Sequence, residues 1–270
     1  VENSKVILEN AMIEQWSAVR KESNYLNSVL SDLLKEQRAD IEKFTKDKEL
    51  QKEYTQRVFP ELLESLRRDT TCGVFLVMAN DQPIGAPGDF TGFFLRDSDP
   101  VTKVDTNSDL LLERGDKTLA RQWGITLDNS WSPAFRFQGK GIRESDDFFY
   151  EPYTAGMAHT GVDMASLGYW SMPFILEDYE MDNHKMITYS VPLVNDGVIY
   201  GVVGTEVSVS YLCNTYFRIQ DLNREQTAGY TIAIDNGDET YKSIAGKGVL
   251  YDAVKMEKDV FSLEHTSYEK

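Results

Sequence analysis

The first 69 residues have a helical pattern and no strand signal, and this constrains the fold more than any other feature. Between positions 8 and 33, apolar residues recur at mostly three- and four-residue spacing, which places them on one face of a helix. These residues are Leu8, Met12, Trp16, Val19, Leu26, Leu30 and Leu33. Because neither proline nor glycine occurs in residues 1–36, we predict one long helix there.

The helical pattern pauses at residues 37–40 and then resumes. Asp40 can cap a new helix, because its carboxylate can accept a bond from a free backbone N–H. Pro60 suits the first turn of a further short helix, since proline is favoured at that position. The apolar residues that follow these two signals are Ile41, Phe44, Tyr54, Val58, Leu62, Leu63 and Leu66.

Two uses of the apolar stripe at residues 8–33 remain open. The stripe could form the interface of a homodimer, or it could pack on the sheet of its own chain. Its spacing drifts from a strict heptad, which makes intramolecular packing at least as good an interpretation as a coiled coil.

Short apolar runs rich in β-forming residues begin at residue 71. Residues 71–78 read TCGVFLVM and residues 91–96 read TGFFLR, and we predict that they pair as antiparallel neighbours. In the polar region that follows, residues 110–112 and 119–123 are interpreted as short helical pieces. Residues 135–137 are expected to form a strand or the end of one.

The strongest strand signal is a pair of apolar runs separated by a turn sequence. Residues 186–194 (MITYSVPLV) and 198–209 (VIYGVVGTEVSV) flank Asn195-Asp196-Gly197, which is typical of a tight hairpin. Residues 211–219 are then expected to form a short helix or crossover. A further sheet is predicted from residues 230–235, with a turn at 236–238 and a strand near 260–263.

Together these signals predict an α+β fold with three segments. They are a helical segment at 1–69, a first sheet module at 70–213 and a smaller second module at 214–270. The boundary is expected between residues 213 and 228. About 45 residues then follow it, which is small for an independent core, so we expect the second module to be incomplete.

Charge and hydropathy exclude several classes of protein. The 44 acidic and 28 basic residues give a net charge of −16, which repels phosphate backbones and argues against nucleic-acid binding. No apolar run approaches the roughly 20 residues that cross a bilayer, and no signal peptide is recognisable. We expect a soluble segment excised from a longer protein, with a complete cytosolic protein as the alternative.

Recognisable catalytic or metal-binding motifs are missing from the sequence. The three histidines and two cysteines have no metal-ligand spacing, and neither a nucleophile elbow nor a phosphate loop occurs. We therefore predict no enzyme activity, no metal and no cofactor. Cys72 and Cys213 are interpreted as two buried thiols, with one disulfide in an oxidising compartment as the alternative.

The aromatic-rich segment 146–175 is the candidate wall of a pocket. Tyr150, Tyr153, Tyr169 and Trp170 offer flat surfaces with polar tips, although packing on a sheet face is an equally good interpretation of each one. Glu206 lies inside an apolar strand, where an unpaired carboxylate is costly. Strand alternation places it on the opposite face from its neighbours 205 and 207, so we interpret it as a pocket acid, with a solvent-facing acid as the rival.

The order of these elements resembles the double Cache family of extracytoplasmic sensors. Two motifs carry the resemblance: residues 201–208 (GVVGTEVS) in the second hairpin strand, and residues 169–174 (YWSMPF) before the hairpin. The layout covers nearly the whole chain, and the recognisable motifs cover about residues 146–212. The resemblance implies PAS-like antiparallel sheets on a long N-terminal helix, in the extracellular or periplasmic part of a membrane receptor.

The resemblance also implies positions for a ligand site. The family's aromatic pair corresponds to Phe149-Tyr150, and its strand acid corresponds to Glu206. The family's arginine corresponds to Asp147, and its upstream tyrosine to Ile142. Because an aspartate reverses the charge that would grip a ligand carboxylate, an ordinary α-amino acid is not expected in the usual pose. A replacement cation could come from Arg121, Arg136 or Arg143.

We therefore expect a sensor that binds a small molecule, amino-acid-like or another metabolite, in the membrane-distal module at 70–213. The segment 1–69 would be the stalk and 214–270 the membrane-proximal module. Output would lie in a histidine kinase, diguanylate cyclase or chemotaxis module elsewhere in the parent protein. The alternatives are a surface module that binds other proteins, and a hydrolase with an unrecognised site.

Overall fold

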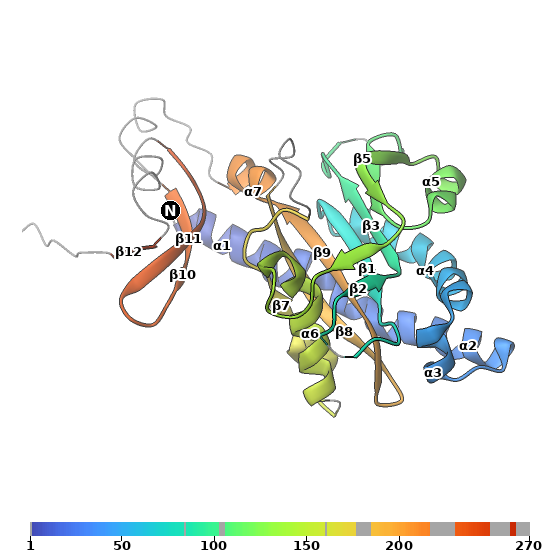
Figure 1. Ribbon diagram of the computed structural model, residues 1–270. Helices are drawn as coiled ribbons and strands as arrows, with labels where there is room; N and C mark the ends of the chain where they lie inside the picture. The colour runs from blue at the N-terminus through green and yellow to red at the C-terminus, as the bar shows by residue number, and fades with distance from the viewer. Residues whose placement is uncertain are drawn as a thin grey trace, which may run out of the picture. The chain divides into compact units, whose positions relative to one another are not determined.

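The computed structural model describes residues 2–83, 85–102, 106–159, 161–176, 185–216, 230–248 and 260–262. The chain divides into two compact units, one formed by Leu8–Ser208 and the other by Val1–Ile7 together with Val209–Lys270. The fold is α+β, as predicted, with helices first and mainly antiparallel sheets after them (Figure 1). Among the described residues, no helix combines the length and apolarity that a bilayer crossing requires.

The predicted long N-terminal helix is helical throughout but irregular at its centre. It consists of α1 (Glu2–Asn10), a π-helical turn (Ala11–Trp16), a 3₁₀ segment (Ala18–Glu22) and α2 (Ser23–Gln37). Ser17 Oγ donates a hydrogen bond to the Ile13 carbonyl at 2.6 Å, within the irregular region. Such back-bonding competes with the regular α-helical ladder, a local effect that apolar periodicity does not reveal.

Two helix starts are predicted after residue 36. The start at Asp40 is confirmed, and the start at Pro60 is wrong. Asp40 caps α3 (Ile41–Lys46) by accepting from the Lys43 N–H at 2.8 Å. Pro60 does not begin a helix, because it lies inside α4 (Lys48–Arg68). The buried face of α4 continues on both sides of Pro60, and this packing outweighs the backbone bond that proline removes.

A seven-stranded sheet forms the centre of the larger unit, in the order β5-β4-β3-β1-β9-β8-β7. Its strands are β1 (Gly73–Met78), β3 (Gly92–Asp97), β4 (Leu110–Arg114), β5 (Thr126–Ser132), β7 (Tyr169–Trp170), β8 (Met186–Asn195) and β9 (Val198–Ser208). The predicted antiparallel pairing of β1 with β3 is confirmed. The leucines at 110–112, predicted to be helical, instead pair with β3, because a ladder partner decides the conformation of so short an apolar run.

The hairpin predicted from residues 186–209 is also confirmed. Strands β8 and β9 pair antiparallel along most of their length. Asp196 and Gly197 have φ values of 49° and 78°, the positive values that a tight hairpin turn requires. This long hairpin carries much of the central sheet.

Different elements cover the two faces of the sheet (Figure 1). Helices α2, α3 and α4 pack on one face, called here the helix face, around a core that includes Val19, Leu26, Leu30 and Leu33. The apolar stripe is therefore used within the chain. The other face, called here the α6 face, is covered by α6 (Asp147–Ala158) and by the two-stranded sheet of β2 (Gly88–Phe90) and β6 (Phe135–Phe137). Short helical segments complete this unit: α5 (Lys117–Trp123) and the 3₁₀ turns Glu144–Asp146 and Met164–Leu167.

The smaller unit contains α7 (Val209–Tyr216) and a sheet of β10 (Tyr230–Asp235), β11 (Thr240–Lys247) and β12 (Val260–Ser262). Its strands pair antiparallel in the order β10-β11-β12, which confirms the strand and turn predicted at 230–238. The predicted helical residues 217–219 and strand residue 263 lie outside the described part of the chain. The module ranges 1–69, 70–213 and 214–270 stay predictions.

Candidate functional site

A row of four residues crosses the α6 face of the sheet. Strand register places Thr188 of β8 beside Glu206 of β9, Glu206 beside Gly73 of β1, and Gly73 beside Arg96 of β3. Glu206 shares its strand parity with Val202, which lies in the core on the α6 face. The predicted alternation is thereby confirmed, and Glu206 points to the side that α6 covers.

Charged groups in this row are paired rather than exposed. Arg96 Nε lies 3.4 Å from Glu206 Oε2, and Arg96 Nη1 forms a second, shorter ion pair with Glu113 Oε1 of β4. Arg96 is 5% exposed, Glu113 1% and Glu206 0%, so all three side chains are removed from water. Removing Glu206 would leave the buried Arg96 charge uncompensated, which costs several kcal/mol.

Burial shifts the protonation of the groups around this cluster. Burial, partly offset by Arg96, raises the pKa of Glu113 to about 8. Burial and the nearby Glu206 carboxylate raise the pKa of the Cys72 thiol. Cys72 is a buried thiol outside any disulfide, as predicted, and the raised pKa makes it unreactive. The prediction that Cys213 is buried is wrong, because its side chain is only partly buried, although it too forms no disulfide.

A second row lies beside the first on the same face. Tyr169 of β7 is in register with Ser190, Ser190 with Gly204, and Gly204 with Phe75. A Cβ at position 204 would lie 2.3 Å from the Phe75 ring, so the ring rests directly over the glycine. This row runs from Tyr169 on the edge strand β7 to Phe75 in the aromatic core under α6.

Two hydroxyl groups on these rows are buried without a partner. Thr188 Oγ1 and Ser190 Oγ are inaccessible to water and have no hydrogen-bond partner among the residues that the structure describes. The Thr188 and Ser190 residues themselves are 0% exposed. An unsatisfied buried hydroxyl costs about 1–3 kcal/mol, so a hydrogen bond to either group would be stabilising.

Helix α6 supplies the predicted aromatic wall on the same face. Tyr150 is buried, and its hydroxyl donates to the Ala86 carbonyl at 2.7 Å. Tyr153 stacks on Phe149 with ring centroids 5.1 Å apart. Helix α6 also packs against β8 and β9, which carry the two polar rows (Figure 1).

Acidic residues gather near Tyr169 at the start of α6. Burial, followed by the charges of Asp147, Glu151 and Glu144, raises the pKa of Tyr169 to about 12. Burial, followed by neighbouring carboxylates, also raises the pKa of Asp147. This end of the site is therefore negative.

Trp170 is separated from the other predicted site residues. It is in register with Tyr189, and the two rings pack with centroids 5.1 Å apart. Tyr189 belongs to the core on the helix face, and Trp170 packs against that core. The structure therefore brings Tyr150, Tyr153, Tyr169, Asp147 and Glu206 to the α6 face and leaves Trp170 on the opposite one.

Four residues on or beside these rows were not singled out from the sequence. They are Arg96, Glu113, Thr188 and Ser190. Thr188 and Ser190 are polar residues inside an otherwise apolar strand run, the same signal that selected Glu206, whereas Arg96 and Glu113 lie at the polar ends of β3 and β4. That signal could have identified Thr188 and Ser190, but it does not select Arg96 or Glu113.

No protein-family model and no curated protein matches the chain at a significant level. Its fold is similar to solved structures, among them the extracellular domains of the putative histidine kinases soHK1S-Z6 and mmHK1S-Z3. Sequence identities to these are 16% and 12%, both TM-scores are 0.39, and 89% and 90% of this chain is covered. This chain spans 71% and 65% of their lengths.

A third similar structure is the sensory domain of the Campylobacter jejuni chemoreceptor Tlp3. Sequence identity is 15% and the TM-score is 0.37, with 98% of this chain and 81% of that chain covered. These three solved structures are two extracellular domains of putative histidine kinases and one sensory domain of a chemoreceptor.

Proposed function

We propose that this chain is the extracytoplasmic sensor of a membrane receptor and that it binds a small molecule on the α6 face of its large sheet. The observation that carries the proposal is the pair of buried, unsatisfied hydroxyls, Thr188 Oγ1 and Ser190 Oγ. A ligand that hydrogen-bonds to both would offset the cost of burying them. The aromatic wall of α6 would cover the ligand's apolar part.

The proposed ligand is amino-acid-like or another small polar metabolite. The α6 face offers hydroxyls and a carboxylate in adjacent rows, and acids surround Tyr169. An amino or hydroxyl group on the ligand would meet acceptors there. Arg96 is already paired with Glu206 and Glu113, so it is not the cation that would hold a ligand carboxylate.

Signalling places one thermodynamic requirement on such a sensor. The ligand must bind two states of the receptor with different affinity, since a ligand with equal affinity for both does not shift the equilibrium between them. We propose that the output belongs to a membrane-anchored parent protein, a histidine kinase, a diguanylate cyclase or a chemoreceptor. A homodimer through the N-terminal helix would have to use residues other than Val19, Leu26, Leu30 and Leu33, because these are buried in the chain's own core.

The proposal is tested by a thermal-shift screen of the proteinogenic amino acids and common polar metabolites, with hits measured by calorimetry. Thr188→Val and Ser190→Ala each remove one hydroxyl while keeping the side chain's volume nearly unchanged. We expect each to weaken a hit by about tenfold, the usual effect of one buried hydrogen bond. Ser28→Ala removes an exposed hydroxyl on α2 and serves as the matched control.

Two results would overturn the proposal. One is a screen in which no compound raises the melting temperature. The other is a hit that binds wild type, Thr188→Val and Ser190→Ala with equal affinity.

A further inference from the structure

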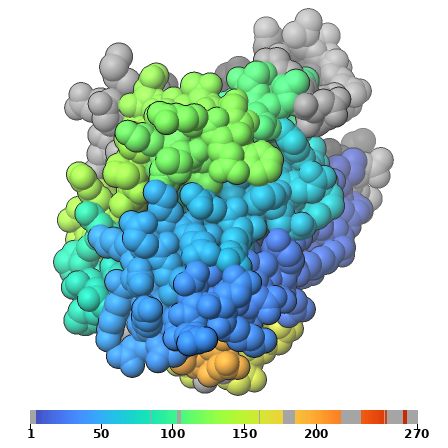
Figure 2. Space-filling model, turned by 90° about the vertical axis from the view of Figure 1, so that its right-hand side faces the viewer, coloured from blue at the N-terminus to red at the C-terminus, as the bar shows by residue number. Residues whose placement is uncertain are grey.

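A cavity of about 440 Å³ opens on the helix face, between α4, α5 and the end of β5. Its size falls within the range of small-molecule sites. Figure 2 shows the face of the molecule where the blue helices α2–α4 meet the green segment that contains α5 and β5. Because the seven-stranded sheet lies between this cavity and the α6 face, the two locations are separate.

One wall of the cavity is flat and apolar. Trp131, Leu119 and Pro133 line it. The indole N–H donates to the Gly115 carbonyl at 3.1 Å, which fixes the orientation of the ring. Gly92 contributes bare backbone to the lining, and a Cβ there would lie 1.9 Å from the Leu76 carbonyl oxygen. The indole therefore offers a flat, oriented surface that suits a planar ring.

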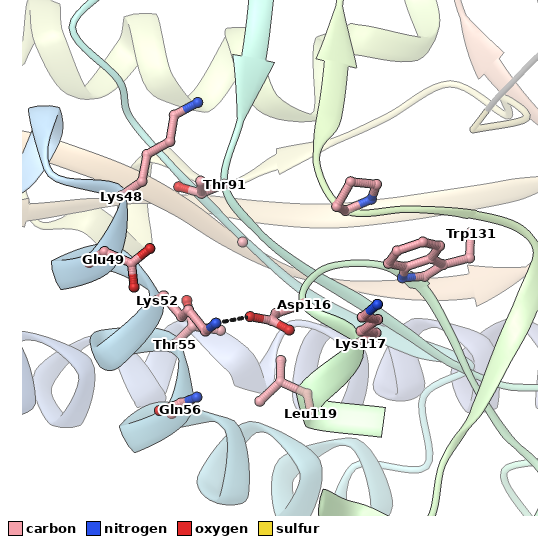
Figure 3. Close-up of a pocket in the computed structure, with 12 residues that line it drawn as sticks. Lys48, Glu49, Lys52, Thr55, Gln56, Thr91, Asp116, Lys117, Leu119 and Trp131 are labelled. Atoms are coloured by element: carbon pink, nitrogen blue, oxygen red, sulfur yellow. Dashed lines mark ion pairs between the residues drawn. The ribbon is translucent and has the colours of Figure 1, made fainter. Parts of the chain in front are cut away.

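Lysines surround the same cavity. Lys52 of α4 is paired with Asp116 at 2.6 Å, so these two charges cancel. Lys48 and Lys117 also line the cavity, and neither forms an ion pair with any residue that the structure describes. Figure 3 shows Lys48 on the α4 side and Lys117 on the side of Trp131, with the Lys52–Asp116 pair between them.

The charge balance favours an anion. Three lysines and two acids, Glu49 and Asp116, line the cavity, which gives it a net charge of +1. The chain as a whole carries −16, so this cavity is positive on a molecule that otherwise repels anions. An ammonium group that is free to meet a carboxylate forms one of the stronger hydrogen bonds in proteins.

We infer that this cavity is a second ligand site, which takes a small aromatic carboxylate. The ring lies against Trp131, and the ammonium groups of Lys48 and Lys117 attract the carboxylate. This site is independent of the proposed function, since it shares no residue with the α6 face.

Calorimetry with sodium benzoate tests the inference, with benzyl alcohol as the uncharged ligand of similar shape. We expect saturable binding of one benzoate, at least about tenfold tighter than benzyl alcohol. Lys48→Gln combined with Lys117→Gln should weaken benzoate by about tenfold or more and leave benzyl alcohol unchanged. Trp131→Leu should weaken both ligands, because it removes the stacking surface.

Two control variants distinguish binding in this cavity from binding elsewhere on the molecule. Lys35→Gln removes an exposed lysine of α2 outside the cavity and should leave benzoate binding unchanged. Thr188→Val should also leave it unchanged, so that failure here and failure of the proposed function are distinguishable. The inference is overturned if benzoate does not saturate, if benzyl alcohol binds equally well, or if Lys35→Gln has the same effect as the double variant.

Discussion

Arg96 Nε lies 3.4 Å from Glu206 Oε2, although β1 runs between the strands that carry them. Gly73 is the β1 residue in register with both. A Cβ at position 73 would lie 2.5 Å from Glu206 Oε2 and 2.9 Å from Glu206 Cβ. The ion pair can therefore cross β1 only because residue 73 has no side chain.

Gly73→Ala should displace Glu206 from Arg96 and destabilise the protein. Overpacking in a buried region costs about 1–3 kcal/mol, and a strained buried ion pair adds to that. We expect the free energy of unfolding, measured by urea titration, to fall by about 2–3 kcal/mol. Gly161→Ala is the matched control, because a Cβ there meets nothing within 4 Å, and equal losses in the two variants would show that the ion pair does not depend on Gly73.

Glu113 should make stability depend on pH. Its pKa is raised by burial to about 8 in the folded protein, from a usual value of 4.5. Folding therefore favours the protonated carboxyl, so this contribution is complete below pH 4.5 and is lost as the pH rises through about 8. The other charges that act on it are those of Arg96, Glu206, Arg114 and Asp128.

Glu113→Gln provides the measurement. Between about pH 5 and 8, wild type should lose on the order of a few kcal/mol of unfolding free energy that the variant does not lose. Urea titrations at several pH values would show this as two curves that diverge steadily. Parallel curves across that window would mean that Glu113 titrates near its ordinary value.

Local signals were sufficient for the long elements of the fold. The hairpin around Asp196-Gly197 combines a turn sequence with two long apolar runs. The turn and the runs predict the same hairpin, so the local signals agree. The cap at Asp40 is equally local. Leu110–Arg114 could not be assigned in this way, because its conformation depends on pairing with β3.

The candidate site was predictable only where strand alternation could be applied. Glu206 could be placed on a face because β9 is long and its parity is clear. Tyr169 and Trp170 form a two-residue strand that no sequence pattern predicts, so the separation of their side chains to opposite faces emerged only from the register with β8. The Arg96–Glu113 contact joins β3 and β4, whose pairing includes a register shift that no sequence rule predicts.

Tyr200 should contribute to stability through its hydroxyl. The Tyr200 Oη donates to Asn27 Oδ1 of α2 at 2.9 Å and lies 3.2 Å from Tyr54 Oη of α4, so it links two helices to β9. Tyr200→Phe should lower the free energy of unfolding by about 1–2 kcal/mol, because the Asn27 amide oxygen loses a donor. Tyr25→Phe, at a position where the side chain is 40% exposed, should change it by less than about 0.5 kcal/mol. Similar effects in both variants would show that the buried hydroxyl contributes little.

Pro60 should weaken α4 even though the helix tolerates it. It lies in the middle of Lys48–Arg68 on the exposed side, where it removes a backbone bond and crowds the preceding turn. Proline also restricts the unfolded chain, which offsets part of that cost. We expect Pro60→Ala to raise the free energy of unfolding by about 1 kcal/mol, visible as a higher urea midpoint with an unchanged slope. A lower midpoint would mean that Pro60 is required for α4 to pack on the sheet.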